Sequence, residues 1–346
     1  MQVPSGKRRA FHTFRHFIPT AVIGVSLLFG ADHALAQVNG MPPTVSQPQG
    51  INLGETSFMD GFSRSGPGWT YLPALRYAQG NAIKDGSGRD AAAFKDPRID
   101  VLTLINHLSY TSPIRIGDAT LGLNALLPVV SLDGRFGQPG ATLAGGGTSV
   151  GDLTISPSLQ FDPVMGATGP LYSQRLEFSF LLPTGRYDRS NDLNQGAGYY
   201  SLNPFWAATL LPTPRWEISW RLHYLYNFKN TQPAGSAPLA YQGQTVRDTQ
   251  AGQAAWINLS TSYEVVRDVR LGLNSYYFKQ LTDSKTNGAD MAGSREQVLG
   301  VGLGAMFTIH RGDKHDVLWI NSYTESHVRN RTRNSLILQA RYAYEF

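Results

Sequence analysis

Residues 216–228 read WEISWRLHYLYNF, and the order of their side chains indicates the fold class. Apolar residues fall on one parity and polar residues on the other, with Leu225 as the exception: Trp216, Ile218, Trp220, Leu222, Tyr224, Tyr226 and Phe228 against Glu217, Ser219, Arg221, His223 and Asn227. Successive side chains of a β-strand point to opposite faces, whereas a helix would distribute both sets around its circumference. The pattern therefore predicts a strand with one apolar and one polar face.

The same period of two recurs from about residue 69 to the end of the chain. In 175–182, for example, the alternation sets Leu176, Phe178, Phe180 and Leu182 against Arg175, Glu177 and Ser179. We count twelve such segments, near 69–80, 98–111, 117–131, 151–162, 171–183, 199–211, 215–228, 250–264, 269–280, 296–309, 315–325 and 335–346. A tilted strand needs about 9–11 residues to cross the hydrocarbon layer, and each segment is long enough.

The connections between these segments alternate between short and long. Short ones lie near Ser112–Ile116, Asp162–Pro170, Pro212–Pro214, Val265–Asp268 and Arg311–Lys314, and long polar ones near 81–97, 132–150, 184–198, 229–249, 281–295 and 326–334. Short turns on one side and long loops on the other are typical of an outer-membrane β-barrel. A soluble β-sandwich does not require this alternation. We predict an all-β, antiparallel transmembrane β-barrel of about twelve strands over 69–346, monomeric or weakly associated, with both ends on the periplasmic, short-turn side.

The first residues have the pattern of a secretory signal peptide. Three basic residues, Lys7–Arg9, precede a short apolar stretch, and Ala34-Leu35-Ala36 fits the small-x-small cleavage rule. We predict cleavage of residues 1–36 and a periplasmic leader with a possible plug over 37–68. The apolar stretch is shorter than the roughly 20 residues of a spanning helix, which disfavours an uncleaved anchor.

Composition agrees with an envelope protein. Charged residues make up 16% of the chain, against about 25% in soluble domains, and there is no Cys. Residues 1–36 hold four basic residues and one acidic one, so their removal lowers the net charge from +5 to +2. We therefore predict no nucleic-acid partner. Outer-membrane lipid is the expected surrounding, in a Gram-negative bacterium.

Aromatic residues gather near the predicted strand ends. We expect two aromatic girdles, one at each membrane–water interface. Their residues are Trp216, Tyr342, Tyr344 and Phe346 near the short turns, and Tyr226, Phe228, Tyr276, Tyr277 and Tyr323 near the long loops. The chain ends on an aromatic residue after an alternating strand. We predict that Tyr342, Tyr344 and Phe346 form the signal that barrel-assembly machinery reads.

Charged residues on the polar parities are candidates for the lining of the lumen. They are Asp152, Arg175, Glu177, Glu217, Arg221, His223, Arg341 and Glu345. Such charges either pair across the lumen as structural contacts or select solutes. Gly300, Gly302 and Gly304 leave one strand face without side chains, which widens the lumen or lets a plug pack closely.

Residues 50–68 precede the first strand and follow no period. Phe58, Met59 and Phe62 stand there in a Gly/Ser context and are candidates for a plug. A twelve-stranded barrel lies between filled eight-stranded barrels and open sixteen-stranded porins. We therefore hypothesise that this segment folds into the lumen and gates it.

Catalytic and metal motifs are weak in this chain. Residues 147–151 match G-x-S-x-G, but a nucleophile elbow needs a strand before the serine and a helix after it. His310 and His315 flank a predicted turn without a metal-binding spacing. We predict no catalytic residues, no metal and no cofactor. A barrel enzyme that hydrolyses lipid or peptide stays an alternative, as does a sealed structural or adhesive barrel.

Several stretches resemble a known family: GINLGETSFMDGF (50–62), PGWTY (67–71), LLPTGRYD (181–188), SLNPFWAATLLPTPRWEISWRLHYLYNFKN (201–230), QAGQAAWINLSTSYEV (250–265), LGLNSYYFKQLTDSK (271–285) and GSREQVLGVG (293–302). They are similar to the family labelled putative MetA-pathway of phenol degradation, over essentially the whole mature chain. The resemblance implies an outer-membrane barrel, described as a transporter and associated with the catabolism of aromatic compounds. The family offers no catalytic residues. We expect a channel for passive uptake of small hydrophobic or aromatic compounds.

Overall fold

The computed structural model describes residues 45–346, which belong to one compact unit, Ala34–Phe346. The predicted signal peptide, 1–36, and the first part of the leader, 37–44, lie outside the described residues. No helix in the described part is long and apolar enough to cross a membrane.

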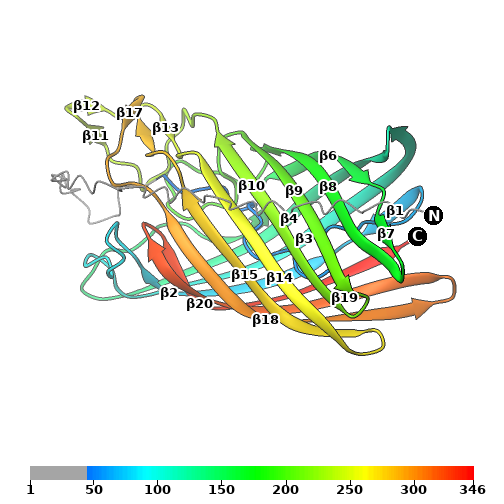
Figure 1. Cartoon of the computed structure of the whole chain (residues 1–346). Coiled ribbons are helices and arrows are strands. Elements are labelled where there is room, and N and C mark those ends of the chain that lie inside the picture. Colours follow the sequence, from blue (N-terminus) through cyan, green and yellow to red (C-terminus); the bar gives the residue numbers. More distant parts are fainter. Residues whose placement is uncertain (1–44) are drawn as a thin grey trace, which may run out of the picture. The chain divides into compact units, whose positions relative to one another are not determined.

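Twelve long antiparallel strands form the wall of a barrel in the described part of the chain (Figure 1). They are β2 (Ala74–Ile83), β3 (Lys95–Ile116), β4 (Ala119–Gly137), β6 (Leu153–Phe161), β8 (Gly169–Leu182), β9 (Ser201–Thr213), β10 (Trp216–Asn227), β14 (Ala254–Val266), β15 (Val269–Gln280), β18 (Gln297–Arg311), β19 (Lys314–Arg329) and β20 (Thr332–Glu345). Shorter strands extend the wall or lie in connections: β1 (Gly68–Tyr71), β5 (Gly147–Val150), β7 (Val164–Gly166), β11 (Ala240–Tyr241), β12 (Gln244–Thr245), β13 (Thr249–Gln250), β16 (Lys285–Thr286) and β17 (Ala289–Asp290).

The sheet closes where the first and last strands meet. β2 pairs with β3 on one side and with β20 on the other, as in Tyr77 opposite Leu338. β1 pairs with the same two neighbours, so β1 and β2 are one strand interrupted at Leu72 and Pro73. A proline has no N–H for a ladder hydrogen bond, which accounts for the break. The prediction of a closed, twelve-stranded antiparallel barrel is confirmed.

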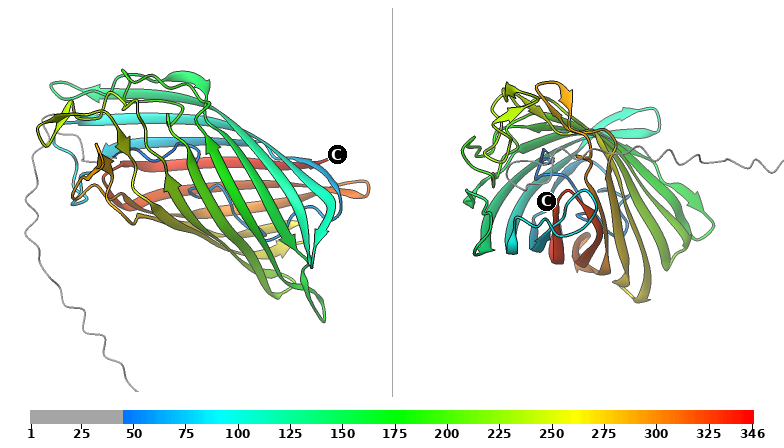
Figure 2. Two further views of the ribbon diagram at one scale, coloured as in Figure 1. Left: turned by 90° about the horizontal axis from the view of Figure 1, so that it is seen from above. Right: turned by 90° about the vertical axis from the view of Figure 1, so that its left-hand side faces the viewer.

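Both described ends of the wall lie at the short-turn end, as Figure 1 shows. The backbone N–H of Phe346 donates to the carbonyl of Trp69 (3.2 Å). Turns of two residues join β3 to β4, β9 to β10, β14 to β15 and β18 to β19. The longer connections gather at the opposite end, which we call the loop end (Figure 2).

One connection is shorter than the sequence indicated. The interval 326–334 was predicted to be a long loop, but β19 and β20 continue through it and leave only a two-residue turn, Asn330–Arg331. Beyond the hydrocarbon layer both faces of a strand meet water, so the polar residues there no longer show the apolar alternation.

Apolar side chains cover the outer face of the wall. Exposed members on five different strands include Leu75, Leu104, Leu123, Leu273 and Leu303. Water does not favour such a continuous apolar surface, whereas lipid does. The inner face carries mostly the residues of the opposite parity, as the buried Asn124, Ser156, Ser219 and Asn274 show.

Two predicted girdle residues lie inside the barrel instead. Tyr276 is 1% exposed and Tyr323 is 3% exposed, with ring centroids 5.3 Å apart. Both belong to the polar, inward parity of their strands. The period of two was therefore the better guide to their position than their aromatic character, because an apolar segment inside the barrel packs against them.

Candidate functional site

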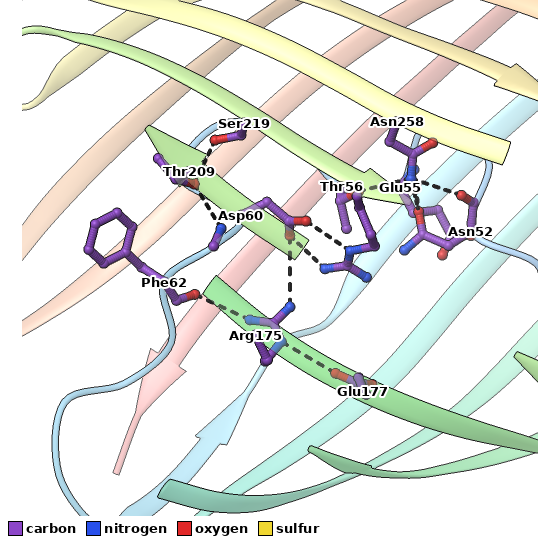
Figure 3. Close-up of polar contacts among 12 residues, drawn as sticks. Asn52, Glu55, Thr56, Asp60, Phe62, Arg175, Glu177, Thr209, Ser219 and Asn258 are labelled. Carbon is purple, nitrogen blue, oxygen red and sulfur yellow. Dashed lines mark hydrogen bonds and ion pairs between the residues drawn. The ribbon is translucent and has the colours of Figure 1, made fainter. Parts of the chain in front are cut away.

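Residues 45–67 run through the lumen, and we call them the inner segment (Figure 3). At the loop end, Gln47 Nε2 donates to the carbonyl of Gly252 (3.1 Å). Near the short turns, the N–H of Gly61 donates to Thr209 Oγ1 (2.8 Å). The leader was expected on the periplasmic side, but its described part enters at the loop end and leads through the barrel to β1.

Apolar side chains of the inner segment pack into one side of the lumen. Leu53 is 5% exposed and lies in a buried cluster with Trp256, Tyr276, Phe278 and Tyr323 from the wall. Burial of a leucine side chain contributes about 1.5–3 kcal/mol. This contact holds the loop-end half of the segment against β14, β15 and β19.

Phe58 fits against the strand face that lacks side chains. It is 1% exposed, and its carbonyl accepts a hydrogen bond from Trp319 Nε1 (3.1 Å). A Cβ placed on Gly304 would lie 2.8 Å from Phe58 Cζ, which is closer than side chains approach. The glycine face of β18 thus gives this ring its space.

The two other plug candidates contact the wall through their backbones. The N–H of Met59 donates to Glu217 Oε2 (3.3 Å). The carbonyl of Phe62 accepts from Arg175 Nη1 (3.4 Å), as Figure 3 shows. These contacts fix the path of the chain rather than the direction of the two side chains.

An ion-pair cluster anchors the middle of the inner segment. Asp60 accepts from Arg221 through both carboxylate oxygens, at 2.8 and 2.6 Å. Arg175 lies 4.0 Å from Asp60 and 3.4 Å from Glu177. Burial raises the pKa of the Asp60 carboxyl, but the guanidinium groups of Arg221 and Arg175 outweigh this effect and hold the pKa below its usual range.

A cavity of about 470 Å³ remains beside the inner segment. Its lining extends from Ala234 and Pro238 in a connection at the loop end to Thr111 and Thr120 beside a short turn. Leu53 of the segment packs against β14, β15 and β19, and the lining of the open space comes mostly from β2, β3, β4, β6 and β8, with further residues from β9, β10 and β20. The arrangement offers a narrow path along the barrel axis.

The sequence-derived lumen candidates fall into two groups. Six line the cavity: Asp152, Arg175, Glu177, Arg221, His223 and Arg341. Glu217 is buried at 0% exposure against Ser219 and Ser262, and Glu345 forms an ion pair with Arg64 (3.4 Å), so neither is among the lining residues. Asp152 stands just before β6 and accepts backbone hydrogen bonds from Gly185 (3.0 Å) and Ala197 (2.8 Å).

Several charged or titratable residues of the lumen were not singled out from the sequence. They include Glu55, Arg76 and His107, which line the cavity, and Asp60, which pairs with Arg221 beside it. Arg76 and His107 lie on inward-facing positions of β2 and β3, and the alternation in those segments contained the signal. Asp60 pairs with residues more than 100 positions away. No local pattern predicts such a contact.

The residues at the chain end lie on the short-turn side. Tyr342 donates its hydroxyl to Asp316 Oδ2 (2.9 Å). The rings of Tyr344 and Phe346 stack at 6.1 Å and are 38% and 52% exposed.

A closed antiparallel barrel with an apolar outer band and a polar inner face defines the class of outer-membrane β-barrels. The chain belongs to the family described as Putative MetA-pathway of phenol degradation, whose model matches residues 80–342. No curated protein matches the sequence.

A solved outer-membrane channel shares the architecture. The chain is similar to the COG4313 outer membrane channel from Pseudomonas putida F1, with 16% identity over 83% of this chain and 98% of that one, at a TM-score of 0.69. The translocator domain of autotransporter NalP from Neisseria meningitidis is more distant, with 12% identity over 83% and 91% and a TM-score of 0.44. The first similarity shows the shared fold. The protein is therefore placed in the outer membrane.

Proposed function

We propose that the protein is a channel for passive passage of small hydrophobic or aromatic solutes across the outer membrane. The observation that supports this function is the cavity beside the inner segment. Its lining includes apolar side chains of β3 and β4, among them Ile99, Val101, Pro128 and Val130. Ligand sites for small molecules are commonly lined in this way, with a few polar groups that fix orientation. The family and the solved channel of the same fold point to the same class of function.

The inner segment acts as a gate in this proposal. It occupies one side of the lumen through buried groups such as Leu53, Phe58 and Asp60. No covalent bond is among its described contacts with the wall. Partial release of the segment would widen the path, and its return would narrow it. Solute movement is diffusion down a gradient.

Uptake of labelled phenol tests the channel. Cells that produce the protein are compared with cells that carry the empty vector, and we expect faster uptake with the protein. Equal uptake would overturn the proposal. Hydrolysis of lipid or peptide by the purified barrel would instead favour an enzyme.

A variant that lacks residues 45–62 tests the gate. We expect a larger single-channel conductance in planar bilayers, because most of the inner segment is then missing from the lumen. Unchanged conductance would contradict gating. Heat-modifiable migration in gels serves as the control that the shortened chain still forms a barrel.

We also propose that the last strand is read by the barrel-assembly machinery through its aromatic end. The exposed, stacked pair of Tyr344 and Phe346 supports this role, because part of each ring is accessible to another protein.

A further inference from the structure

Two arginines lie next to each other on the cavity wall. Arg76 is opposite Gln339 in the ladder between β2 and β20, and Arg341 is opposite Ala74. Residues two apart on a strand face the same side, so the two guanidinium groups are diagonal neighbours on the inner face. Both line the cavity.

Neither guanidinium group has an ion-pair partner. Within residues 45–346, no carboxylate lies within 4.0 Å of Arg76 or Arg341, and the buried Nε of Arg76 has no hydrogen-bond partner. Arg341 lies over the ring of Trp319, 5.1 Å from its centroid. By contrast, Arg221 is satisfied by Asp60. Buried charges are normally paired, so the free pair marks a position for an anion.

Two of the nearby acidic groups are engaged by other arginines. Arg76, Arg175, Arg221 and Arg341 line the cavity with Glu55, Glu177 and Glu325, and Asp60 lies against Arg175 and Arg221 beside it. Asp60 and Glu177 serve Arg175 and Arg221. Burial raises the pKa of the Glu55 carboxyl, although Arg76 and Arg341 act to lower it. Glu55 lies near both free arginines but forms no ion pair within 4.0 Å with either.

Apolar side chains adjoin the free arginines. Thr103 of β3 lies opposite Arg76, and its neighbours on the inner face are Val101 and Ile105. A solute whose charged group reached Arg76 would place its apolar body against these two side chains. The cavity wall thus places two guanidinium groups beside apolar side chains.

We propose that Arg76 and Arg341 form a binding subsite for the carboxylate of an aromatic or similarly apolar carboxylic acid. The planar guanidinium group matches a carboxylate in two-point geometry. Val101 and Ile105 contact the ring. This inference rests on the proposed channel function and names the charge of the solute that the channel prefers.

Reversal potentials in planar bilayers under a potassium benzoate gradient test the subsite. Wild-type protein is expected to pass benzoate in preference to potassium. The variant Arg76→Gln/Arg341→Gln is expected to lose about tenfold in this preference, since a charge-assisted hydrogen bond contributes roughly that factor. Glu55→Gln should shift the preference toward benzoate. Arg89→Gln is the matched control, because Arg89 is exposed and does not line the cavity.

The variants Arg76→Lys and Arg341→Lys retain the charge and guard against misfolding of the Gln variant. They should keep most of the preference. An unaltered reversal potential in a folded Gln variant would overturn the subsite.

Uptake of labelled benzoate and its neutral isostere benzamide by cells separates the two proposals. Faster uptake of benzoate than of benzamide supports the subsite. Equal uptake of both, above the level of empty-vector cells, removes the subsite and leaves the channel. If neither benzoate nor benzamide is taken up faster than by empty-vector cells, the channel proposal itself is overturned.

Discussion

Asp60 of the inner segment and Arg221 of β10 form a two-point ion pair inside the barrel, at 2.8 and 2.6 Å. The carboxylate is 7% exposed and the guanidinium group 8% exposed. Their pairing joins a segment without regular structure to a rigid strand. It is a charge-assisted contact of the inner segment with the wall, made through two hydrogen bonds.

Asp60→Asn should loosen the inner segment. The change leaves Arg175 and Arg221 close together without their shared carboxylate, and loss of one partner of a buried pair costs about 3–5 kcal/mol. We expect larger and noisier single-channel currents. Asp133→Asn, at an exposed carboxylate on β4, is the matched control. Currents identical to wild type would show that Asp60 does not hold the gate.

Acid should release the same contact only at low pH. The pKa of Asp60 lies below its usual value, which is about 3.9 in an unfolded chain. The contact therefore stabilises the folded state fully above about pH 4 and loses this contribution as the pH falls through the lower, folded-state pKa. Conductance should stay constant from about pH 7 to pH 5 and rise below about pH 4. A rise above pH 5 would point to another group, and Asp60→Asn should lack the acid step.

Gly304→Ala should displace Phe58. The added methyl group would lie 2.8 Å from the phenyl ring, and it would also crowd Asn274 and Asn321. Overpacking of a buried site costs about 1–3 kcal/mol. We expect increased conductance with an intact barrel. Gly50→Ala, where a Cβ meets open space, should behave as wild type.

Leu303→Arg should destabilise the barrel in lipid. Leu303 is 64% exposed on the outer face near the middle of β18. An arginine on the lipid face costs about 2–4 kcal/mol at the bilayer centre. Urea unfolding in lipid vesicles measures the change. The control Thr154→Arg puts the same side chain on the cavity wall, and comparable losses for both variants would contradict the assignment of inner and outer faces.

Phe346→Ala should lower the amount of assembled protein without changing the stability of the barrel that forms. The side chain is exposed and stacks only on Tyr344 among the described aromatic residues. Heat-modifiable protein in outer-membrane fractions gives the yield. Phe228→Ala removes an exposed aromatic residue at the loop end and is the control. Equal yields for both variants and wild type would remove Phe346 from the assembly signal.

The sequence predicts the wall well because each strand residue meets one of two solvents. Apolar side chains face the lipid and polar side chains face the lumen, so the same alternation recurs in the strands from β2 to β20. The pattern fails at 326–334, where β19 and β20 rise above the lipid and both faces meet water. At Tyr276 the period holds and the aromatic character misleads, because the ring faces inward and packs with Leu53.

The lumen was less accessible to prediction than the wall. Parity alone placed Arg175, Arg221 and Arg341 on inner positions. It gave no information on which of them are neutralised, because Asp60 comes from a segment without a period. The distinction between paired and free arginines depends on where that segment lies, which is a property of the three-dimensional contacts.

The passage of residues 45–67 along the barrel axis restricts the order of assembly. These residues directly precede β1, and β2 completes the wall by pairing with β20. One order places this segment against the open sheet before β2 pairs with β20. The other order inserts the segment, from one end, into a barrel that has already closed. The placement of residues 45–67 and the closure of the β2–β20 seam are thus mechanically linked.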